Sequence, residues 1–264
     1  MIRRLLIAQA FVAPIFSVCL ALAGANVIAS LAPLFVSHLV LLYATLVPNA
    51  EWWGPVITHF DTDAREVWLT IDDGPCPAHT LTMLDVLKQF GALATFFVVG
   101  QRAEQYPHLI TEILARGHAL ANHTQTHPRG SFWGAGPRRI AREIDRCAET
   151  LRTTPERPAS FFRAPVGMVS PFLHPALVRR GLMLVGWSVR GLDTIRRDPE
   201  QVAARIEQLV RPGAIILLHE TLRVETEPKF SPRCLELTLQ RLTSDGYRFV
   251  IPQPEQLRAR GDAK

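Results

Sequence analysis

The sequence predicts an α/β domain built on a parallel sheet of about seven strands, preceded by apolar helices long enough to cross a membrane. Three observations carry this prediction. Short β-rich runs alternate with segments of helical periodicity over residues 67–252, several helical segments begin at a proline or end at a glycine, and the first 50 residues are almost free of charge. Such alternation favours a parallel sheet, open or closed into a barrel.

The N-terminal segment has no Asp, Glu, Lys or Arg between residues 5 and 50. A membrane-spanning helix needs about 20 apolar residues, so this segment has room for two. Residues 5–22 and 27–47 are the candidates, with Arg3 and Arg4 ahead of the first. We therefore expect residues 1–50 to anchor the protein in a membrane, the inner membrane of a bacterium.

Two interpretations of this segment stay open. In one, both stretches form a helical hairpin, and Arg3 and Arg4 favour a cytoplasmic N-terminus and a cytoplasmic domain. In the other, the first stretch is a signal peptide cleaved near Ala23 or Ala25, each with a small residue two positions upstream. The second stretch leaves some membrane attachment in both cases.

Residues 51–64 are expected to form a linker, and residues 65–264 one globular domain. β-Branched and aromatic residues in short runs predict its strands. The expected strands cover residues 67–71, 95–100, 118–123, 160–166, 182–189, 213–220 and 247–252. The expected helices cover residues 80–90, 107–117, 137–151, 171–181, 198–210 and 231–246.

Terminal residues and apolar stripes justify the helices in chain order. The first ends at Gly91, the second begins at Pro107 and ends at Gly117, and the fifth begins with Asp198 and a proline. The third has apolar residues on one face, at positions 140, 144, 147, 148 and 151. No internal repeat interrupts this order.

The charge pattern argues against a nucleic-acid partner, and the cysteine spacing argues against structural disulfides or a cysteine metal site. The net charge of +5 is dispersed, and the basic run at residues 138–142 is followed by Glu143 and Asp145. This is the pattern of a mixed-charge helix and not of a nucleic-acid-binding stripe, so no nucleic acid is expected. The four cysteines show no paired spacing, which argues against a disulfide framework and a Cys-x-x-Cys metal site.

Polar side chains gather where the expected strands end. These are Asp72, Asp73, His123, residues 163–165, Trp187 and His219. In open parallel sheets and in (β/α) barrels the functional side chains lie at the C-terminal ends of the strands. We therefore expect all of them on one rim of the sheet.

His123 and His127 have i, i+4 spacing, which on a helical turn places both imidazoles on one face. With a carboxylate from a neighbouring strand end they would form an Asp-His-His set, the three protein ligands of a catalytic zinc. A bound cation would also explain why two carboxylates, Asp72 and Asp73, stand at adjacent positions. One aspartate ligates the cation, and the cation's charge allows the other to stay ionised beside it.

Five motifs resemble those of the polysaccharide deacetylases, also known as carbohydrate esterase family 4 or NodB-homology enzymes. In chain order they are "TIDDGP", "NHTQTH", "FRAPVG", "GWSVRGLD" and "ILLH", within about residues 65–252. The resemblance implies a distorted (β/α) barrel and a metal-dependent hydrolase. It would remove N-acetyl or O-acetyl groups from an amino-sugar glycan.

The resemblance also implies a role for each motif residue. Asp73, His123 and His127 would be the ligands of a divalent metal, most simply Zn²⁺. Asp72 would be the general base that takes a proton from the metal-bound water, and Arg163 would orient it. His219 would be the general acid that protonates the leaving amine.

Further residues would shape the substrate site. The backbone N–H of Val166, after Pro165, would stabilise the oxyanion, and Trp187 and Leu217 would surround the acyl methyl group. Thr124 would brace the histidine turn.

Two positions depart from the family pattern. Arg190 stands where an aspartate is common, which leaves Asp193 to support the acid or the arginine. Val166 replaces a usual aromatic residue, which weakens the assignment of the substrate but not of the catalytic groups.

Two alternative functions stay open. The first is an amidase or deformylase acting on a lipid-linked sugar or a non-carbohydrate amide, suggested by the apolar segment and by Arg190. The second is a non-catalytic glycan-binding membrane protein. It is disfavoured because a binding module has no need of the Asp72 and His219 pair. The side of the membrane also stays open, since a glycan substrate suits an extracytoplasmic domain.

Overall fold

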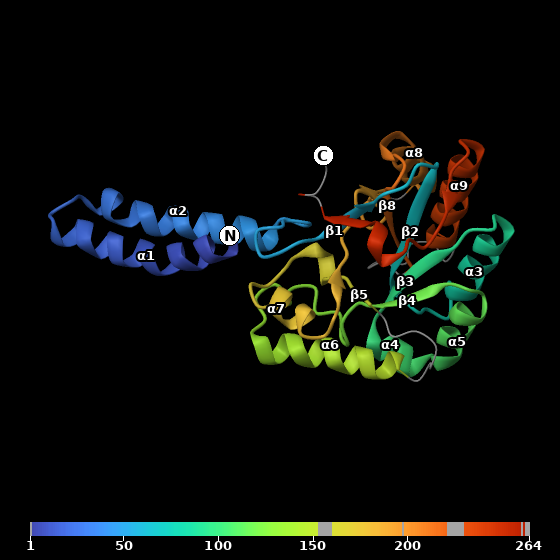
Figure 1. Cartoon of the computed structure of the whole chain (residues 1–264), viewed down its shortest axis with the longest axis horizontal. Helices are drawn as coiled ribbons and strands as arrows, with labels where there is room; N and C mark the ends of the chain where they lie inside the picture. The colour runs from blue at the N-terminus through green and yellow to red at the C-terminus, as the bar shows by residue number, and fades with distance from the viewer. Residues whose placement is uncertain (1, 153–159, 197, 221–229, 260, 262–264) are drawn as a thin grey trace.

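The computed structural model describes residues 2–152, 160–196, 198–220, 230–259 and 261, and it contains a helical hairpin and an α/β domain. The hairpin consists of α1 (Ile2–Leu22) and α2 (Val27–Leu46). Figure 1 shows that it projects away from the domain, with the connection between the two helices at its far end. The start of α1 and the end of α2 both lie at the domain.

The hairpin confirms the expectation of two apolar N-terminal helices. Both are long and apolar enough to cross a membrane. At 1.5 Å per residue each is about 30 Å long, the thickness of a hydrocarbon core. Asn26 caps α2 by accepting a hydrogen bond from the Ala29 backbone N–H at 2.9 Å. Large apolar side chains such as Phe11 and Phe35 are exposed along both helices.

The domain is a parallel half-barrel, which confirms the expected fold class. The sheet order is β6-β5-β4-β3-β2-β8-β7, and β9 pairs with the start of β2. Its strands are β2 (Glu66–Gly74), β3 (Ala94–Val98), β4 (Ala119–Asn122), β5 (Phe161–Phe162), β6 (Met183–Leu184), β7 (Val189–Arg190), β8 (Ile215–His219) and β9 (Arg248–Phe249). Every pair within this sheet is parallel.

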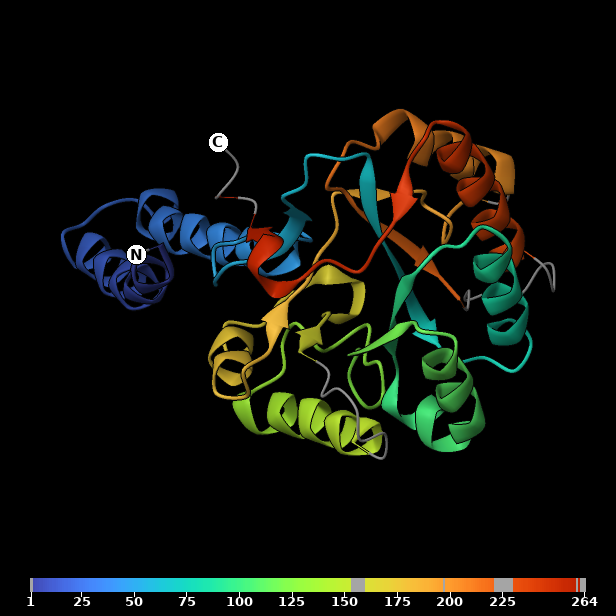
Figure 2. The same cartoon turned by 45° about the vertical axis from the view of Figure 1, so that its right-hand side comes forward.

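Helices surround the strands, as Figure 2 shows. They are α3 (Thr80–Gln89), α4 (Gly100–Gln105), α5 (Pro107–Ala115), α6 (Pro137–Leu151), α7 (Leu173–Val178), α8 (Pro199–Leu209) and α9 (Phe230–Ser244). Two short 3₁₀ helices cover Pro165–Gly167 and Pro254–Gln256. Each expected helix is present, and α4 is an additional one.

The central strand β2 sets which side chains enter the barrel. Val67, Leu69 and Ile71 pack in the apolar cluster that includes residues of α3 and α9. The alternate residues Trp68 and Thr70 are buried with other inward groups, and Asp72 follows them at the strand end. Because side chains alternate along a strand, this register directs Asp72 into the barrel.

Residues 182–189 do not form the single strand expected from their sequence. They form β6 at one edge of the sheet and β7 at the other, with the chain crossing between them. During the crossing Gly186 N–H donates to the carbonyl of Ile57 at 2.8 Å, and Ser188 N–H donates to that of Ile215 at 3.1 Å. A Cβ at Gly186 would overlap Asn49 Oδ1 and lie 2.9 Å from Val56 Cγ1, so any larger residue would displace these side chains. The apolar run therefore bridges the two edges.

The segment of residues 51–64, expected to be a linker, contains β1 (Ile57–Phe60), which pairs with β10 (Leu257–Ala259). It buries Trp53 and Val56. β1 also forms isolated bridges to Val185, which follows the edge strand β6, and to Ala214, which precedes β8, the neighbour of the other edge strand. It thus lies across the opening of the half-barrel, and the division of the chain into domains stays a prediction.

Two glycines with nearly equal φ allow the cost of a steric clash to be distinguished from the cost of a strained backbone. Gly213 (φ 78°) lies against β1, where a Cβ would overlap the carbonyl oxygen of Phe60, whereas a Cβ at Gly246 (φ 79°) meets nothing within 4 Å. Gly246→Ala is expected to cost about 1–2 kcal/mol, the penalty of a left-handed L-residue. Gly213→Ala is expected to cost about 1–3 kcal/mol more. Thermal unfolding of both variants measures the difference in stability. Equal losses of stability would show that β1 can move away from the added methyl group without a loss of free energy.

Candidate metal centre and active site

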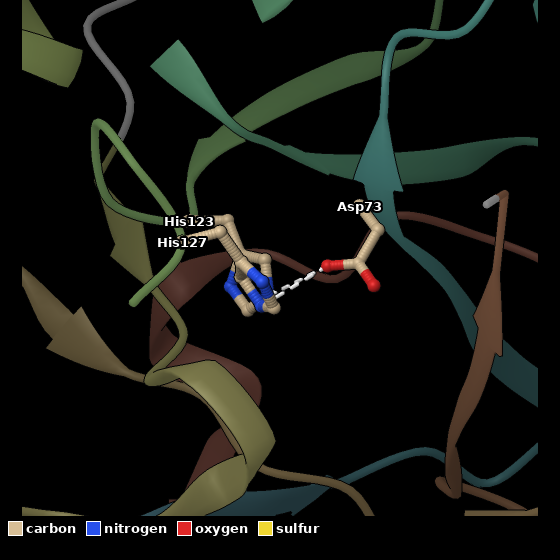
Figure 3. Close-up of side chains that lie close together, drawn as sticks. All are labelled: Asp73, His123 and His127. Atoms are coloured by element: carbon tan, nitrogen blue, oxygen red, sulfur yellow. Dashed lines mark ion pairs between the residues drawn. The ribbon is translucent and has the colours of Figure 1, made fainter. Parts of the chain in front are cut away.

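Asp73, His123 and His127 converge at the C-terminal end of the sheet, as Figure 3 shows. The Asp73 Oδ1 atom lies 3.4 Å from Nε2 of His123 and 3.1 Å from Nε2 of His127. One potential ligand atom from each residue lies within 4.8 Å of the other two. In the described part of the chain this is the one such group of three His, Cys, Asp or Glu residues.

The adjacent aspartates face the same site although alternation along a strand would separate them. Asp72 Oδ2 lies 3.7 Å from Nε2 of His123, close to the distance found for Asp73. Asp73 has a φ of 70°, and the register with β3 shifts between Asp72 and Gly74. A bulge at a strand end redirects a side chain in this way. The irregular end of β2 therefore places both carboxylates at one site.

The histidine motif is a tight turn and not the helical turn assumed from its spacing. Asn122 Oδ1 accepts a hydrogen bond from Thr124 N–H at 2.9 Å, and Thr124 Oγ1 accepts one from His127 N–H at 3.1 Å. Thr124 and His127 have φ values of 69° and 49°. The two ring centroids are 4.7 Å apart, so the turn brings the imidazoles together without a helix.

Left-handed backbone concentrates at this site. Asp73, Thr124, His127 and Val166 are four of the six non-glycine residues with positive φ in the described part of the chain. Each costs on the order of 1–2 kcal/mol for an L-residue, most for the β-branched Thr124 and Val166. Such conformations persist where surrounding contacts over-determine them, and they cluster at functional sites.

The ionisation of the group suits a metal cation. Burial would raise the pKa of Asp73, but its contacts with His123 and His127 hold this pKa below its ordinary range. Burial, together with repulsion from His123, lowers the pKa of His127 to about 3. An ionised carboxylate and a neutral imidazole are the forms that ligate metals.

Hydrogen bonding also directs His123 towards a metal. Its Nδ1 atom lies 2.9 Å from the carbonyl oxygen of Arg163, which can only accept. The proton therefore sits on Nδ1, and the lone pair of Nε2 faces Asp73. Metal-ligating histidines commonly have this arrangement, in which a backbone carbonyl fixes the ring. The donor set thus fits a divalent metal.

Arg129 contacts two of these three residues. Its guanidinium donates to Asp73 Oδ2 at 2.8 Å and to His127 Nδ1 at 3.0 Å. A neutral imidazole that accepts at Nδ1 carries its proton on Nε2. Arg129 therefore has to release His127 before Nε2 of that ring can bind a metal.

Asp72 and Arg163 form a buried ion pair beside the group. The guanidinium donates to Asp72 Oδ1 at 2.6 Å and to Thr70 Oγ1 at 2.8 Å. It also donates to the carbonyl oxygens of Val185 at 3.2 Å and Gly186 at 2.7 Å. Burial lowers the pKa of Arg163, against the effect of Asp72. Arg163 thus orients Asp72 next to His123.

His219 lies at the end of β8, with Asp193 against it. The Asp193 carboxylate accepts from the His219 backbone N–H at 2.7 Å and lies 3.0 Å from Nδ1 of the ring. Burial would lower the pKa of His219, but the charge and hydrogen bond of Asp193 and the charges of Asp73 and Asp72 raise it to about 9. Of the two residues that the sequence left for Asp193 to support, His219 and Arg163, the structure therefore puts it against His219.

The four expected substrate-site residues lie around the same rim. Leu217 is buried on β8 and pairs with Thr70 on one side and with Arg190 on the other. The Trp187 ring centroid is 5.9 Å from the guanidinium carbon of Arg163. Pro165 and Val166 begin the 3₁₀ helix that follows Arg163, and the Val166 side chain is 43% exposed.

Arg129 and Glu220 were not among the expected site residues. The Glu220 N–H donates to the carbonyl oxygen of Asp72 at 2.9 Å, and its carboxylate accepts from Cys76 N–H at 2.8 Å. Burial raises the pKa of Glu220 to about 7. Glu220 thus ties the loop after Asp73 to the end of β8. Its place directly after His219 was the available signal, whereas nothing local marks Arg129.

Comparison with known proteins gives one consistent result. A family model for polysaccharide deacetylase matches residues 59–185. The chain is 40% identical to a chitooligosaccharide deacetylase of Sinorhizobium fredii over 160 residues, which are 60% of this chain and 74% of the relative.

Two solved structures are similar to the domain. One is a peptidoglycan N-acetylglucosamine deacetylase, with a TM-score of 0.67 and 28% identity over 73% of this chain and 88% of that one. The other is a family 4 carbohydrate esterase from Streptomyces lividans in complex with acetate. Its TM-score is 0.65, with 27% identity over 75% of this chain and 98% of that one.

The Asp72–Arg163 pair predicts a specific pattern of stability. Arg163→Met leaves the Asp72 charge buried without its cation, so we expect a loss of about 3–5 kcal/mol. The double variant Asp72→Leu/Arg163→Met removes both charges and is expected to recover part of this loss, because the carbonyls of Val185 and Gly186 lose their donor in both variants. Thermal or urea unfolding of the two variants and the wild type tests this. A single-variant loss below about 1 kcal/mol, the range of exposed pairs, would contradict it.

Proposed function

The chain belongs to the polysaccharide deacetylase family and is a hydrolase of carbon–nitrogen bonds, and we propose that it removes the N-acetyl group from an amino-sugar glycan. The observation that carries this proposal is the convergence of two carboxylates from the end of β2 with two imidazoles that follow β4. Asp73 lies within 3.4 Å of both imidazoles, and Asp72 lies 3.7 Å from His123. The relatives named for chitooligosaccharide and for peptidoglycan N-acetylglucosamine support this class of substrate.

We propose Asp73, His123 and His127 as ligands of a divalent metal, with Zn²⁺ the best match to an Asp-His-His donor set. When bound, such an ion lowers the pKa of water to near 7 and polarises a carbonyl oxygen. Ligation by Asp73 also explains why a second carboxylate, Asp72, is tolerated beside it.

The residues around this group have separate tasks in the proposed reaction. Asp72, fixed by Arg163, accepts the proton of the attacking water. His219, protonated by virtue of Asp193, donates a proton to the departing nitrogen. The N–H of Val166 stabilises negative charge on the carbonyl oxygen, an effect worth several kcal/mol per donor.

The proposal also assigns residues to the acetyl-binding pocket and to membrane attachment. Trp187 and Leu217 are proposed to enclose the methyl group of the acetyl substituent, and Thr124 and Asp193 to hold the histidines. The helices α1 and α2 are proposed to fix the enzyme to a bacterial inner membrane. An amidase acting on another acyl group would use the same residues, and the size of the acyl group released would distinguish it.

The ligand role of Asp73 has a direct test. Asp73→Asn removes the charge between the two imidazoles, so bound metal and acetate release are expected to fall together, the latter by more than about 100-fold. The measurements are the metal content of the purified full chain and acetate release from an N-acetylated glycan. Asp85→Asn, an exposed carboxylate on α3, is the matched control. Full activity with normal metal content in Asp73→Asn would exclude the ligand role.

The acid role of His219 predicts a shift of the pH profile. A general acid acts in its protonated form, so the rate falls as the pH rises through its pKa. Of the groups that raise the pKa of His219, Asp193 has the largest effect. Asp193→Asn is therefore expected to move the alkaline limb of kcat/KM downward by about 1–3 units.

The same Asp85→Asn variant serves as the control for the profile. A uniform fall of kcat/KM at every pH in Asp193→Asn, with the limb in place, would show that Asp193 does not act through the ionisation of His219.

A further inference from the structure

The C-terminal end of α2 and the residues just after it are hydrogen-bonded to two loops of the candidate active site. The Asn49 side-chain amide donates to the carbonyl oxygen of Trp187 at 2.8 Å. The Val169 N–H, just after the Pro165–Gly167 turn, donates to the carbonyl oxygen of Thr45 at 3.1 Å. These two loops contain Val166 and Trp187, proposed above to contact the acyl group. The hairpin thus reaches the rim of the site.

The hairpin and the domain are closely packed at this junction. A Cβ at Gly167 would lie 2.6 Å from Cη2 of Trp187 and 3.0 Å from Cβ of Pro48, so these three residues are in close contact. Ala44 of α2 and Leu6 of α1 are buried in the same apolar cluster as residues of α7 and β5. The end of the hairpin next to the domain is therefore packed into the domain core.

Interfacial residues mark the level of the bilayer surface at this same junction. Tyr43 is 52% exposed, and its ring centroid lies 5.2 Å from that of Trp52. Arg3 and Arg4 begin α1 at the same end of the hairpin. Tyr, Trp and Arg are the residues that gather at the boundary of a membrane. The headgroup layer is thus expected at the level of residues 43–52.

Distance along the chain then limits how far the site lies from the lipid. Gly167, packed against Pro48, is four residues from Arg163, a span of at most about 14 Å. The headgroup layer is itself about 5–8 Å deep on each side of a bilayer. Asp72 and its Arg163 therefore lie close to the membrane surface.

A cation on the rim points to the chemistry of the substrate. Arg190 is exposed, and its guanidinium carbon lies 5.9 Å from the Trp187 ring centroid. It forms no ion pair with the carboxylates of the described residues. A sugar attached to a membrane lipid is commonly joined through a phosphate, and an exposed guanidinium recognises that group well.

We propose that the acylated amino sugar is carried on a membrane lipid through a phosphate and is presented to the site from the bilayer that holds α1 and α2. This inference rests on the proposed function and names its substrate class. Water cleaves the amide: the acyl C–N bond breaks, a C–O bond forms, and the nitrogen leaves protonated, so the lipid keeps a free amino sugar and a carboxylate is released. No oxidant or second substrate is needed.

The test compares three substrates with the full chain in lipid nanodiscs. They are a polyprenyl diphosphate N-acetylglucosamine in the same nanodisc, water-soluble N-acetylglucosamine 1-phosphate, and a neutral N-acetylated chitotetraose. We expect kcat/KM for acetate release to be at least about 10-fold higher for the lipid substrate than for the other two. Equal or faster release from either soluble substrate would overturn the inference and leave the deacetylase function intact. No acetate from any of them would contradict the proposed function itself.

A matched pair of variants tests the role of Arg190. Arg190→Gln is expected to lower kcat/KM for the lipid substrate by about 10-fold, the effect of one charged hydrogen bond, and for chitotetraose by less. Arg248→Gln removes another exposed arginine, on β9 at the opposite end of β2, and is expected to leave the ratio unchanged. Equal losses on both substrates in Arg190→Gln would show that this cation does not recognise the phosphate.

Discussion

The buried ion pair between Arg163 and Asp72 is the interaction on which the site depends. The guanidinium contacts β2 through Asp72 and Thr70, lies over the Phe97 ring of β3 at 4.1 Å, and binds the crossing segment at Val185 and Gly186. Burying two charges is costly unless good geometry and further hydrogen bonds compensate, and here both are present. The guanidinium of Arg163 is also the hydrogen-bond donor to the carbonyl oxygens of the crossing segment. One side chain therefore connects β2 to the crossing segment and orients the carboxylate proposed as the base.

That pair also explains why two aspartates stand side by side. Asp72 is compensated by Arg163, and Asp73 is left for the imidazoles and the cation proposed between them. The bulge after Asp72 is what makes the division possible, because a regular strand would send Asp73 to the helix-covered face. The strained backbone at Asp73, Thr124 and His127 is then the cost of bringing three short side chains to one point.

The sequence predicted the alternating elements and the rim because both follow from local patterns. Periodicity placed the strands and helices, and the shared direction of parallel strands placed Asp72, His123 and His219 together. It failed where distant partners decide the structure. Residues 182–189 look like one strand, but hydrogen bonds to Ile57 and Ile215 divide them between two edges. Arg129 reaches Asp73 across 56 positions, and no local pattern records such a contact.

The junction between hairpin and domain bears on the two interpretations of the N-terminal segment. Cleavage near residue 23 would remove α1, and with it Leu6, which is buried in the domain's own apolar cluster beside Ala44. A cleaved leader has no reason to contribute to the mature core, so the packing favours the hairpin. In the membrane arrangement proposed above, the hairpin would put the domain on the side of Arg3 and Arg4, which the distribution of positive charge would make the cytoplasmic side. A finished extracellular glycan would not reach that face, whereas a lipid-linked sugar would, so the proposed topology agrees with the proposed substrate class.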